Sequence, residues 1–239
     1  RGKGYYGGYD LMNIGTHLIN CIIGVAGHCQ SVIATAVADG RRVTPEDAVS
    51  SPSGMGTIAG EHITATLQLE GNVSATLLQH RFPEGDVNGL KIEFLGDDGR
   101  IFWNLRGAWL LPEPHPLPAD AQMMHWETLE PVFAPGYDAA MDANPDEFAF
   151  VDEYVNALDD VRDHECSGAE ARHVMEIVMG VFESAAYGRR IDLPQGRRDH
   201  PLLRWRAEHG LGEPEPTPRP VSEWLEAEDR RLGRAGVGV

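Results

Sequence analysis

Cysteine, lysine and long apolar runs are all scarce in this chain, and each scarcity excludes a class of protein. Three cysteines are too few for a disulfide framework, which favours a protein of the reducing cytoplasm. No stretch of about 18 apolar residues occurs, so the sequence predicts no transmembrane helix. Acidic residues outnumber basic ones by 37 to 20, and the net charge of -17 argues against nucleic acid or an anionic membrane surface as a partner.

Familiar nucleotide, nucleophile and metal motifs are also missing. Gly54, Gly56 and Gly60 have the wrong final spacing for the dinucleotide fingerprint, and they follow a Ser- and Pro-containing loop instead of a strand. Neither a P-loop lysine motif nor a G-x-S-x-G elbow occurs. The scattered histidines and cysteines match no paired zinc spacing, so the sequence predicts no metal site.

The first residues, Arg-Gly-Lys-Gly-Tyr-Tyr, do not form a signal peptide. The chain opens at Arg1 without a methionine and enters glycine-rich sequence almost at once. We therefore expect the natural protein to continue upstream of this residue.

A helix near the start of the chain carries a stripe of polar residues on an otherwise apolar surface. Asp10, Asn13, His17 and Asn20 follow one another at offsets of three, four and three within residues 10–24, which keeps them on one helical face. Because buried polar groups cost free energy unless they are satisfied, the pattern predicts a helix buried on most sides, with its polar stripe lining a cleft. A histidine there exchanges a proton near neutral pH.

A structural interpretation of the same stripe stays open. Asp10 serves equally well as the N-cap of the helix, with Asn13 in the first turn bonding back to it. His17 would then be a core histidine whose hydrogen bonds are satisfied, which is the common case for buried polar groups.

The middle of the chain has the alternation of β-strands. Residues 62–69 place Ile63, Ala65 and Leu67 on one face and polar side chains on the other, and residues 73–77 repeat the pattern after a turn. We expect an antiparallel sheet with one face on a core, and with a Thr-rich second face that meets water or another copy of the chain. Further strands are predicted at 31–38, 90–94, 101–105 and 125–129. The rest of 110–137 reads as irregular.

Two helices follow, each with an N-terminal signal. Asn144-Pro145-Asp146-Glu147 places a capping Asn before Pro, and Ser167-Gly-Ala-Glu170 is a capping box. The chain is therefore predicted to be α+β, with helices packed on one face of an open, mainly antiparallel sheet. We expect this domain to occupy residues 1–194. Residues 195–239 would form an extension with a Pro-rich spacer and a short helix.

Gly7-Gly8, Asn13 and His17 resemble the pattern of the substrate domain of the Gfo/Idh/MocA oxidoreductases, the glucose-fructose oxidoreductase and inositol dehydrogenase family. The segment from Glu183-Ser-Ala-Ala to Pro194 agrees with it as well. The resemblance implies a fold like the C-terminal domain of glyceraldehyde-3-phosphate dehydrogenase. It also implies an NAD- or NADP-dependent oxidation or reduction of a sugar, sugar derivative or cyclitol, in a homo-oligomer assembled through the outer face of the sheet.

The same resemblance assigns roles to residues. It makes His17 the general acid/base on the reacting hydroxyl, a task suited to a pKa near neutrality. Asn13 would position the substrate or the imidazole; many members have aspartate there, and an amide cannot act as a carboxylate base. Asp10 and Tyr6 are further candidates for contacts with substrate hydroxyls.

This chain departs from the family in one large respect. Members carry an N-terminal Rossmann domain with a glycine-rich nucleotide loop, and a catalytic lysine in a Glu-Lys-Pro motif; Lys3 and Lys91 lie in no such motif. We therefore expect the cofactor to be bound mainly by a domain outside this chain. The alternatives are a truncated, non-catalytic binding or assembly module that keeps the sheet interface, and a cofactor-free lyase or isomerase that uses His17.

Overall fold

The chain divides into two structural units, one inserted within the sequence of the other. The computed structural model describes residues 11–51, 54–80, 90–112, 126–140, 144–216 and 223. Residues 1–81 and 168–239 make up the first unit, and residues 82–167 make up the second. The predicted division of the chain at residue 194 stays a prediction.

The first unit is built on an antiparallel sheet with the strand order β11-β1-β5-β6, and β2 also pairs with β1. Thr66 of β5 lies opposite Thr76 of β6, and Ala34 of β1 lies opposite Ala65 of β5. A separate two-stranded sheet joins β3 to β4. The strands are β1 (Cys29–Ala38), β2 (Arg41–Arg42), β3 (Val49–Ser50), β4 (Thr57–Ile58), β5 (His62–Leu69), β6 (Ser74–His80) and β11 (Ile191–Asp192), with 3-10 turns at Pro45–Asp47 and Glu70–Asn72.

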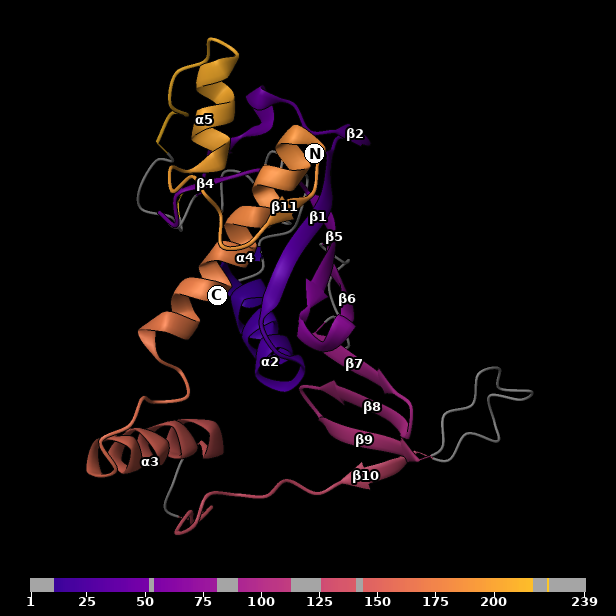
Figure 1. The fold of residues 1–239 in the computed structure, drawn as a ribbon, viewed down its shortest axis with the longest axis vertical. Coiled ribbons are helices and arrows are strands. Elements are labelled where there is room, and N and C mark those ends of the chain that lie inside the picture. Colours follow the sequence, from indigo (N-terminus) through magenta and orange to yellow (C-terminus); the bar gives the residue numbers. More distant parts are fainter. Residues whose placement is uncertain are drawn as a thin grey trace, which may run out of the picture. The chain divides into compact units, whose positions relative to one another are not determined.

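Helices pack on one face of this sheet, as the alternation predicts. Helix α4 (Gly168–Tyr187) lies along β1, and it also contacts α2 (Thr16–Ala26) and α5 (Pro201–Glu208) (Figure 1). The core between them contains the predicted apolar face of β5 and the apolar stripe of α4, whose members Ile177, Val178, Val181 and Phe182 are all buried. Helix α4 ends before Gly188, whose φ of 65° suits a residue without a side chain.

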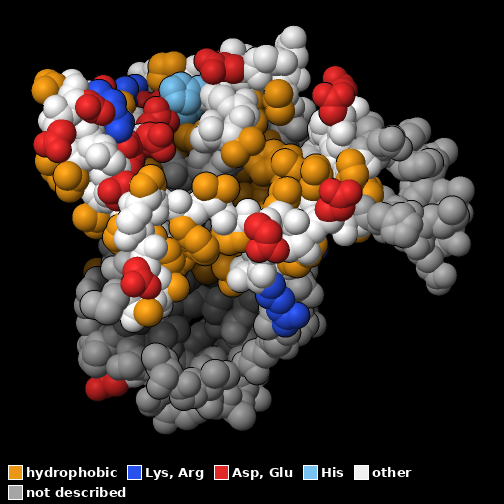
Figure 2. Space-filling view, turned by 90° about the horizontal axis from the view of Figure 1, so that it is seen from below, with side chains coloured by type: hydrophobic (Ala, Val, Ile, Leu, Met, Phe, Trp, Pro, Cys, Tyr) orange, Lys and Arg blue, Asp and Glu red, His pale blue; other side chains and the backbone are white. Residues whose placement is uncertain are grey.

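The second unit contains a four-stranded antiparallel sheet with the order β10-β9-β8-β7 and helix α3 (Pro145–Asp159). Its strands are β7 (Lys91–Gly96), β8 (Gly99–Asn104), β9 (Gly107–Pro112) and β10 (Glu127–Leu129). The predicted cap of α3 is confirmed, because the Asn144 side chain accepts a hydrogen bond from the Asp146 amide at 3.0 Å. Val151, Val155 and Leu158 of its apolar stripe are exposed. In the view of the whole chain in Figure 2, apolar side chains lie at the surface among scattered acidic ones.

Three parts of this fold differ from the sequence-based expectation. The strands form two main sheets in separate units, where one sheet was expected. The sequence predicts irregular chain from residue 110 onward, but residues 107–112 form strand β9. Strand β11 and helix α5 are present although the sequence analysis predicts neither. The predicted C-terminal helix lies almost wholly outside the described residues. Within the described ranges, no helix has the length and apolar character needed to cross a membrane.

Candidate functional site

The predicted site begins in a π-helical turn, η1 (Leu11–Gly15), that leads directly into α2. Thr16 stabilises this junction, since its hydroxyl donates to the Asn13 carbonyl at 2.5 Å. Helix α2 ends at Ala26, and the amide of Gly27 donates to the Ile23 carbonyl at 3.0 Å. The helix is anchored by residues buried against the core, which are Leu11, Gly15, Ile19, Ile22 and Ile23.

His17 is exposed on α2, while Asn13 and Asn20 are half-buried. This corrects the prediction of a helix buried on most sides. A π turn is wider than an α turn, so residues before and after it do not keep the angular spacing of one continuous α-helix. Asn13 lies before this π-to-α junction and His17 after it, and the side chain of His17 is the exposed one.

Of the four predicted site residues, the structure describes only two. Tyr6 and Asp10, together with Gly7-Gly8, lie outside the described residues. Asn13 and His17 occupy consecutive turns of η1 and α2. An exposed imidazole at this place is able to exchange a proton with a bound hydroxyl, and the Asn13 side chain offers both a donor and an acceptor.

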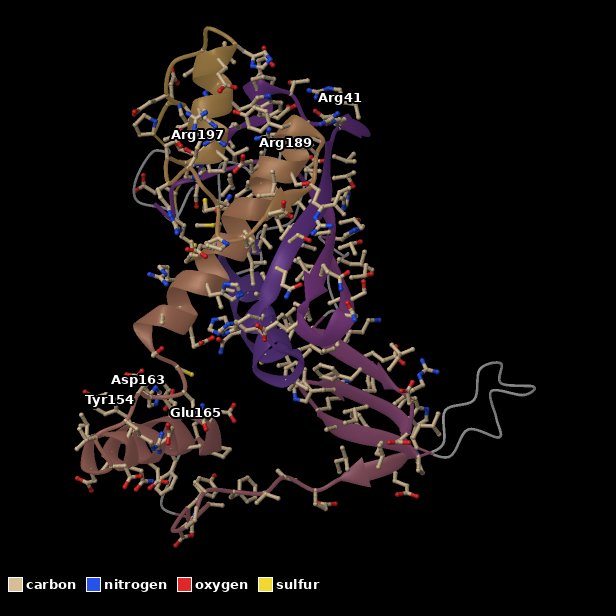
Figure 3. The ribbon with its side chains drawn as sticks, viewed as in Figure 1. Arg41, Tyr154, Asp163, Glu165, Arg189 and Arg197 are labelled. Carbon is tan, nitrogen blue, oxygen red and sulfur yellow. The ribbon has the colours of Figure 1, made fainter. Side chains whose placement is uncertain are left out.

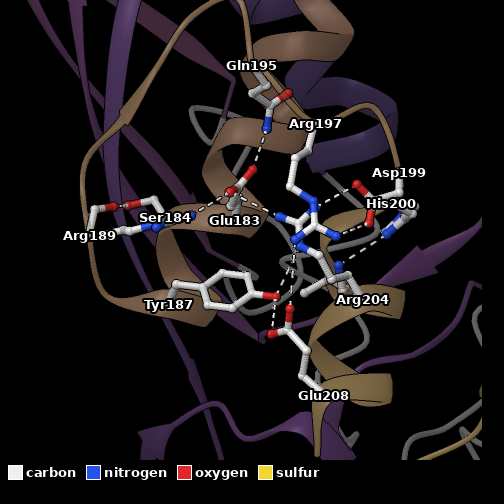
Figure 4. Close-up of polar contacts among 11 residues, drawn as sticks. Glu183, Ser184, Tyr187, Arg189, Gln195, Arg197, Asp199, His200, Arg204 and Glu208 are labelled. Carbon is white, nitrogen blue, oxygen red and sulfur yellow. Dashed lines mark hydrogen bonds and ion pairs between the residues drawn. The ribbon is translucent and has the colours of Figure 1, made fainter.

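A second polar cluster lies where α4 meets α5 and the segment between them (Figure 4). The Glu183 carboxylate is buried, forms an ion pair with Arg204 Nη2 at 3.0 Å and accepts a hydrogen bond from the side-chain amide of Gln195 at 3.0 Å. The buried Arg204 also donates to Asp199 at 2.8 Å and to the Tyr187 hydroxyl at 3.2 Å. Buried charges of this kind are tolerated only when they are paired.

The pKa shifts in this cluster follow from burial and pairing. Burial alone would lower the pKa of Arg204, but the hydrogen bond to Tyr187 and the charge of Glu183 outweigh it and raise the value. Burial raises the pKa of Tyr187. It lowers the pKa of His200, whose Nδ1 accepts the amide of Leu202 at 3.3 Å as the cap of α5. These groups keep fixed protonation states near neutral pH and suit a structural role.

A third cluster joins the start of β1 to α4. The rings of His28 and His173 lie 4.7 Å apart, and His28 Nε2 lies 3.1 Å from the Glu170 carboxylate. His173 Nε2 accepts the amide of Cys29 at 3.0 Å. Burial raises the pKa of the Cys29 thiol to about 11, which leaves it an inert thiol at neutral pH. Among the described residues, no three His, Cys, Asp or Glu side chains are grouped so as to hold a metal ion.

Sequence reasoning missed one set of charged residues altogether. Arg189, Arg190 and Arg197 line a cavity beside Glu183 in the segment between α4 and α5. Figure 3 shows Arg189 and Arg197 near that junction, at the same end of the first unit. The available signal was the density of arginine in residues 189–206, which stands out in an acidic chain.

Comparison with solved structures identifies the fold, whereas no protein-family model and no curated protein sequence matches the chain. Levoglucosan dehydrogenase in complex with NADH and levoglucosan is similar with a TM-score of 0.55 at 17% identity, over 77% of this chain and 50% of that one. An NAD-binding oxidoreductase from Klebsiella pneumoniae has a TM-score of 0.54 at 12% identity, over 76% and 49%.

An oxidoreductase from Agrobacterium radiobacter, in complex with NAD+, L-tartaric acid and magnesium, has a TM-score of 0.51 at 16% identity, over 76% of this chain and 48% of that one. The chain therefore spans about half the length of these neighbours. At such identities the likeness shows the fold alone. The α+β fold with antiparallel sheets is the part of the sequence-based expectation that this comparison supports.

Proposed function

We propose that this chain is the substrate-domain portion of an NAD(P)-dependent oxidoreductase that acts on a hydroxyl or ketone of a sugar, sugar derivative or cyclitol. One coincidence carries the proposal. A fold similar to that of levoglucosan dehydrogenase occurs in a chain whose Gly7-Gly8, Asn13 and His17 have the spacing of the Gfo/Idh/MocA substrate domain. Neither observation depends on the other.

In this proposal His17 is the general acid/base. Its exposed imidazole accepts the hydroxyl proton as the alcohol is oxidised and returns it in the reverse reaction. Asn13, one turn earlier, orients the substrate hydroxyl or the imidazole. Asp10 and Tyr6, which lie outside the described residues, are the candidates for hydrogen bonds to other hydroxyls of the substrate.

The described residues do not supply a nucleotide site of the usual kind. The strands pair in antiparallel fashion, whereas a dinucleotide cradle needs a parallel βαβ unit with a glycine-rich loop. When bound, the nicotinamide cofactor provides the redox chemistry. We infer that it is held mainly by a domain outside this chain.

The test uses the protein made from its complete reading frame. Turnover is measured with NAD+ and NADP+ on a panel of sugars and cyclitols for the wild type, for His17→Ala and for the control His164→Gln, which changes a half-buried histidine of the other unit. We expect His17→Ala to lower kcat by about 100-fold or more, with the thermal unfolding temperature and the control unaffected. Unchanged turnover in a folded His17→Ala protein would reject the assignment.

We propose in addition that the outer face of the first unit's sheet joins copies of the chain. Ile33 and Leu78 are more than half exposed there, 54% and 59%, among the exposed Thr35, Thr66 and Thr76. Leu78→Glu should then shift the molar mass measured by light scattering toward the monomer, while the control Val25→Glu on α2 leaves it unchanged. The same surface would serve the alternative function, a non-catalytic assembly module.

A further inference from the structure

Basic residues are concentrated in one short segment of this acidic chain. Six of its 20 Lys and Arg residues lie between residues 189 and 206, against two acidic residues in the same interval. They are Arg189, Arg190, Arg197, Arg198, Arg204 and Arg206. The segment is therefore a local positive region in a chain with a net charge of -17, and it favours an anionic ligand.

The same segment lines an open cavity of about 280 Å³ at the surface. Three arginines line it, Arg189, Arg190 and Arg197, and all three are more than 60% exposed, so their remaining donors are accessible to a ligand. Gly196 also lines the cavity, and a Cβ built on it would meet no atom within 4 Å. The backbone there is open to close approach by a ligand.

Neighbouring carboxylates hold the three guanidinium groups in place. Arg189 Nη2 donates to Glu183 at 3.1 Å, and Arg190 Nε donates to Asp192 at 2.9 Å. Arg197 Nη2 donates to Asp199 at 3.2 Å (Figure 4), and its Nη1 lies 3.9 Å from Glu208. Each hydrogen bond uses one nitrogen of its guanidinium group. Since a guanidinium has five N–H donors, each arginine is oriented and still has donors to offer.

We propose that this cavity binds a phosphate group, either as inorganic phosphate or on a small phosphate ester. A carboxylate is satisfied by one bidentate arginine, whereas the oxygens of a tetrahedral dianion bridge several guanidinium groups at once. Glu183 and Asp192 also line the cavity, so the charged side chains that line it sum to about one positive unit, and Asp199 and Glu208 beside Arg197 offset that charge further. We therefore expect moderate affinity with strong dependence on salt.

This site goes beyond the proposed oxidoreductase function, and none of its lining residues lies on η1 or α2. Its test is accordingly a binding measurement that needs no turnover. Titration calorimetry with inorganic phosphate, and separately with glycerol 3-phosphate, is carried out on the full chain at constant ionic strength set with chloride. Tighter binding of one probe identifies which form of phosphate the cavity prefers.

The matched variants are Arg190→Gln and Arg197→Gln, with Arg172→Gln as the control. Arg172 lies on α4, is 72% exposed and does not line the cavity. Among the described residues, the ion pair of Arg190 is with the exposed Asp192, so its replacement should leave the fold intact. We expect Arg190→Gln and Arg197→Gln each to weaken phosphate binding at least tenfold, and Arg172→Gln to have no effect. Arg190→Lys should bind phosphate more tightly than Arg190→Gln and less tightly than the wild type. Absence of saturable binding to the wild type, or equal weakening in the control, would overturn the proposal.

Discussion

Ser184 of helix α4 and Ala34 of strand β1 are joined by a buried hydrogen bond, in which the Ser184 hydroxyl accepts the Ala34 amide at 2.7 Å. The same hydroxyl donates to the Arg189 carbonyl at 2.6 Å. Strand β11 pairs with β1 only at Ser31 and Val32. The Ser184 hydroxyl therefore provides a hydrogen bond at a point of β1 where β11 no longer pairs with it. It satisfies the Ala34 amide, which would otherwise be buried without a partner.

Ser184→Ala should consequently destabilise the first unit. It leaves the Ala34 amide and the Arg189 carbonyl without this partner, which costs about 1–3 kcal/mol in free energy of unfolding. Chemical denaturation monitored by circular dichroism measures this loss. The control is Ser74→Ala, at an exposed position of β6, and equal stability of the two variants would contradict the role given to Ser184.

Glu183 and Arg204 should be coupled energetically. Both side chains are buried and lie 3.0 Å apart. Removing either partner leaves the other charge to its remaining ion pair, with Arg189 for Glu183 and with Asp199 for Arg204, and should cost about 1–3 kcal/mol in free energy of unfolding. Glu183→Leu, Arg204→Met and the double variant form a thermodynamic cycle. We expect the loss in free energy of unfolding in the double variant to be smaller than the sum of the two single losses by about 1 kcal/mol or more. Strict additivity would exclude the coupling.

Acid should weaken the fold through buried histidines. Burial lowers the pKa of His173 and His200 below the ordinary value of 6.5. The folded state then binds fewer protons than the unfolded state near that pH, so the free energy of unfolding falls as the pH drops below about 6.5. We expect His200→Gln to lose less stability than the wild type between pH 7.5 and 5.5. An unchanged slope in His200→Gln would reject this explanation.

Cys29 should be the slowest thiol to react in the native protein. It is buried, and its pKa of about 11 leaves little thiolate at pH 8, whereas Cys166 is exposed. We expect Cys29 to label with Ellman's reagent more than tenfold more slowly than Cys166, and unfolding in guanidinium should abolish the difference. Mass spectrometry of the labelled peptides distinguishes the residues. Equal native rates would show that the start of β1 opens readily.

Local patterns predicted the parts of the fold that depend on local rules. The alternation in residues 62–69 gave the buried face of β5, and the sequence around Asn144 gave the start of α3, because both signals are complete within a few residues. Strand β9 escaped prediction because Gly107-Ala-Trp-Leu-Leu-Pro112 does not alternate. Its identity as a strand comes from pairing with β8 and β10.

The candidate site was harder to predict for the same reason. The spacing of Asn13 and His17 is visible in the sequence, but the π turn that changes their exposure is not. The arginine cavity depends on Glu183 and Arg197 lining the same hollow beyond the end of α4, an arrangement that no periodicity encodes. The sequence therefore proposes candidate residues for the site, and packing decides which of their side chains are exposed.

The insertion of the second unit between β6 and α4 has a consequence for synthesis on the ribosome. Ala34 and Ser184 are 150 residues apart, so at ~5–20 residues per second α4 emerges roughly 8–30 seconds after β1. During that interval helix α4 is not yet present to cover the apolar face of β1 and β5. The nascent first unit thus presents a ready substrate for chaperones, and its folding is completed only when the C-terminal third of the chain arrives.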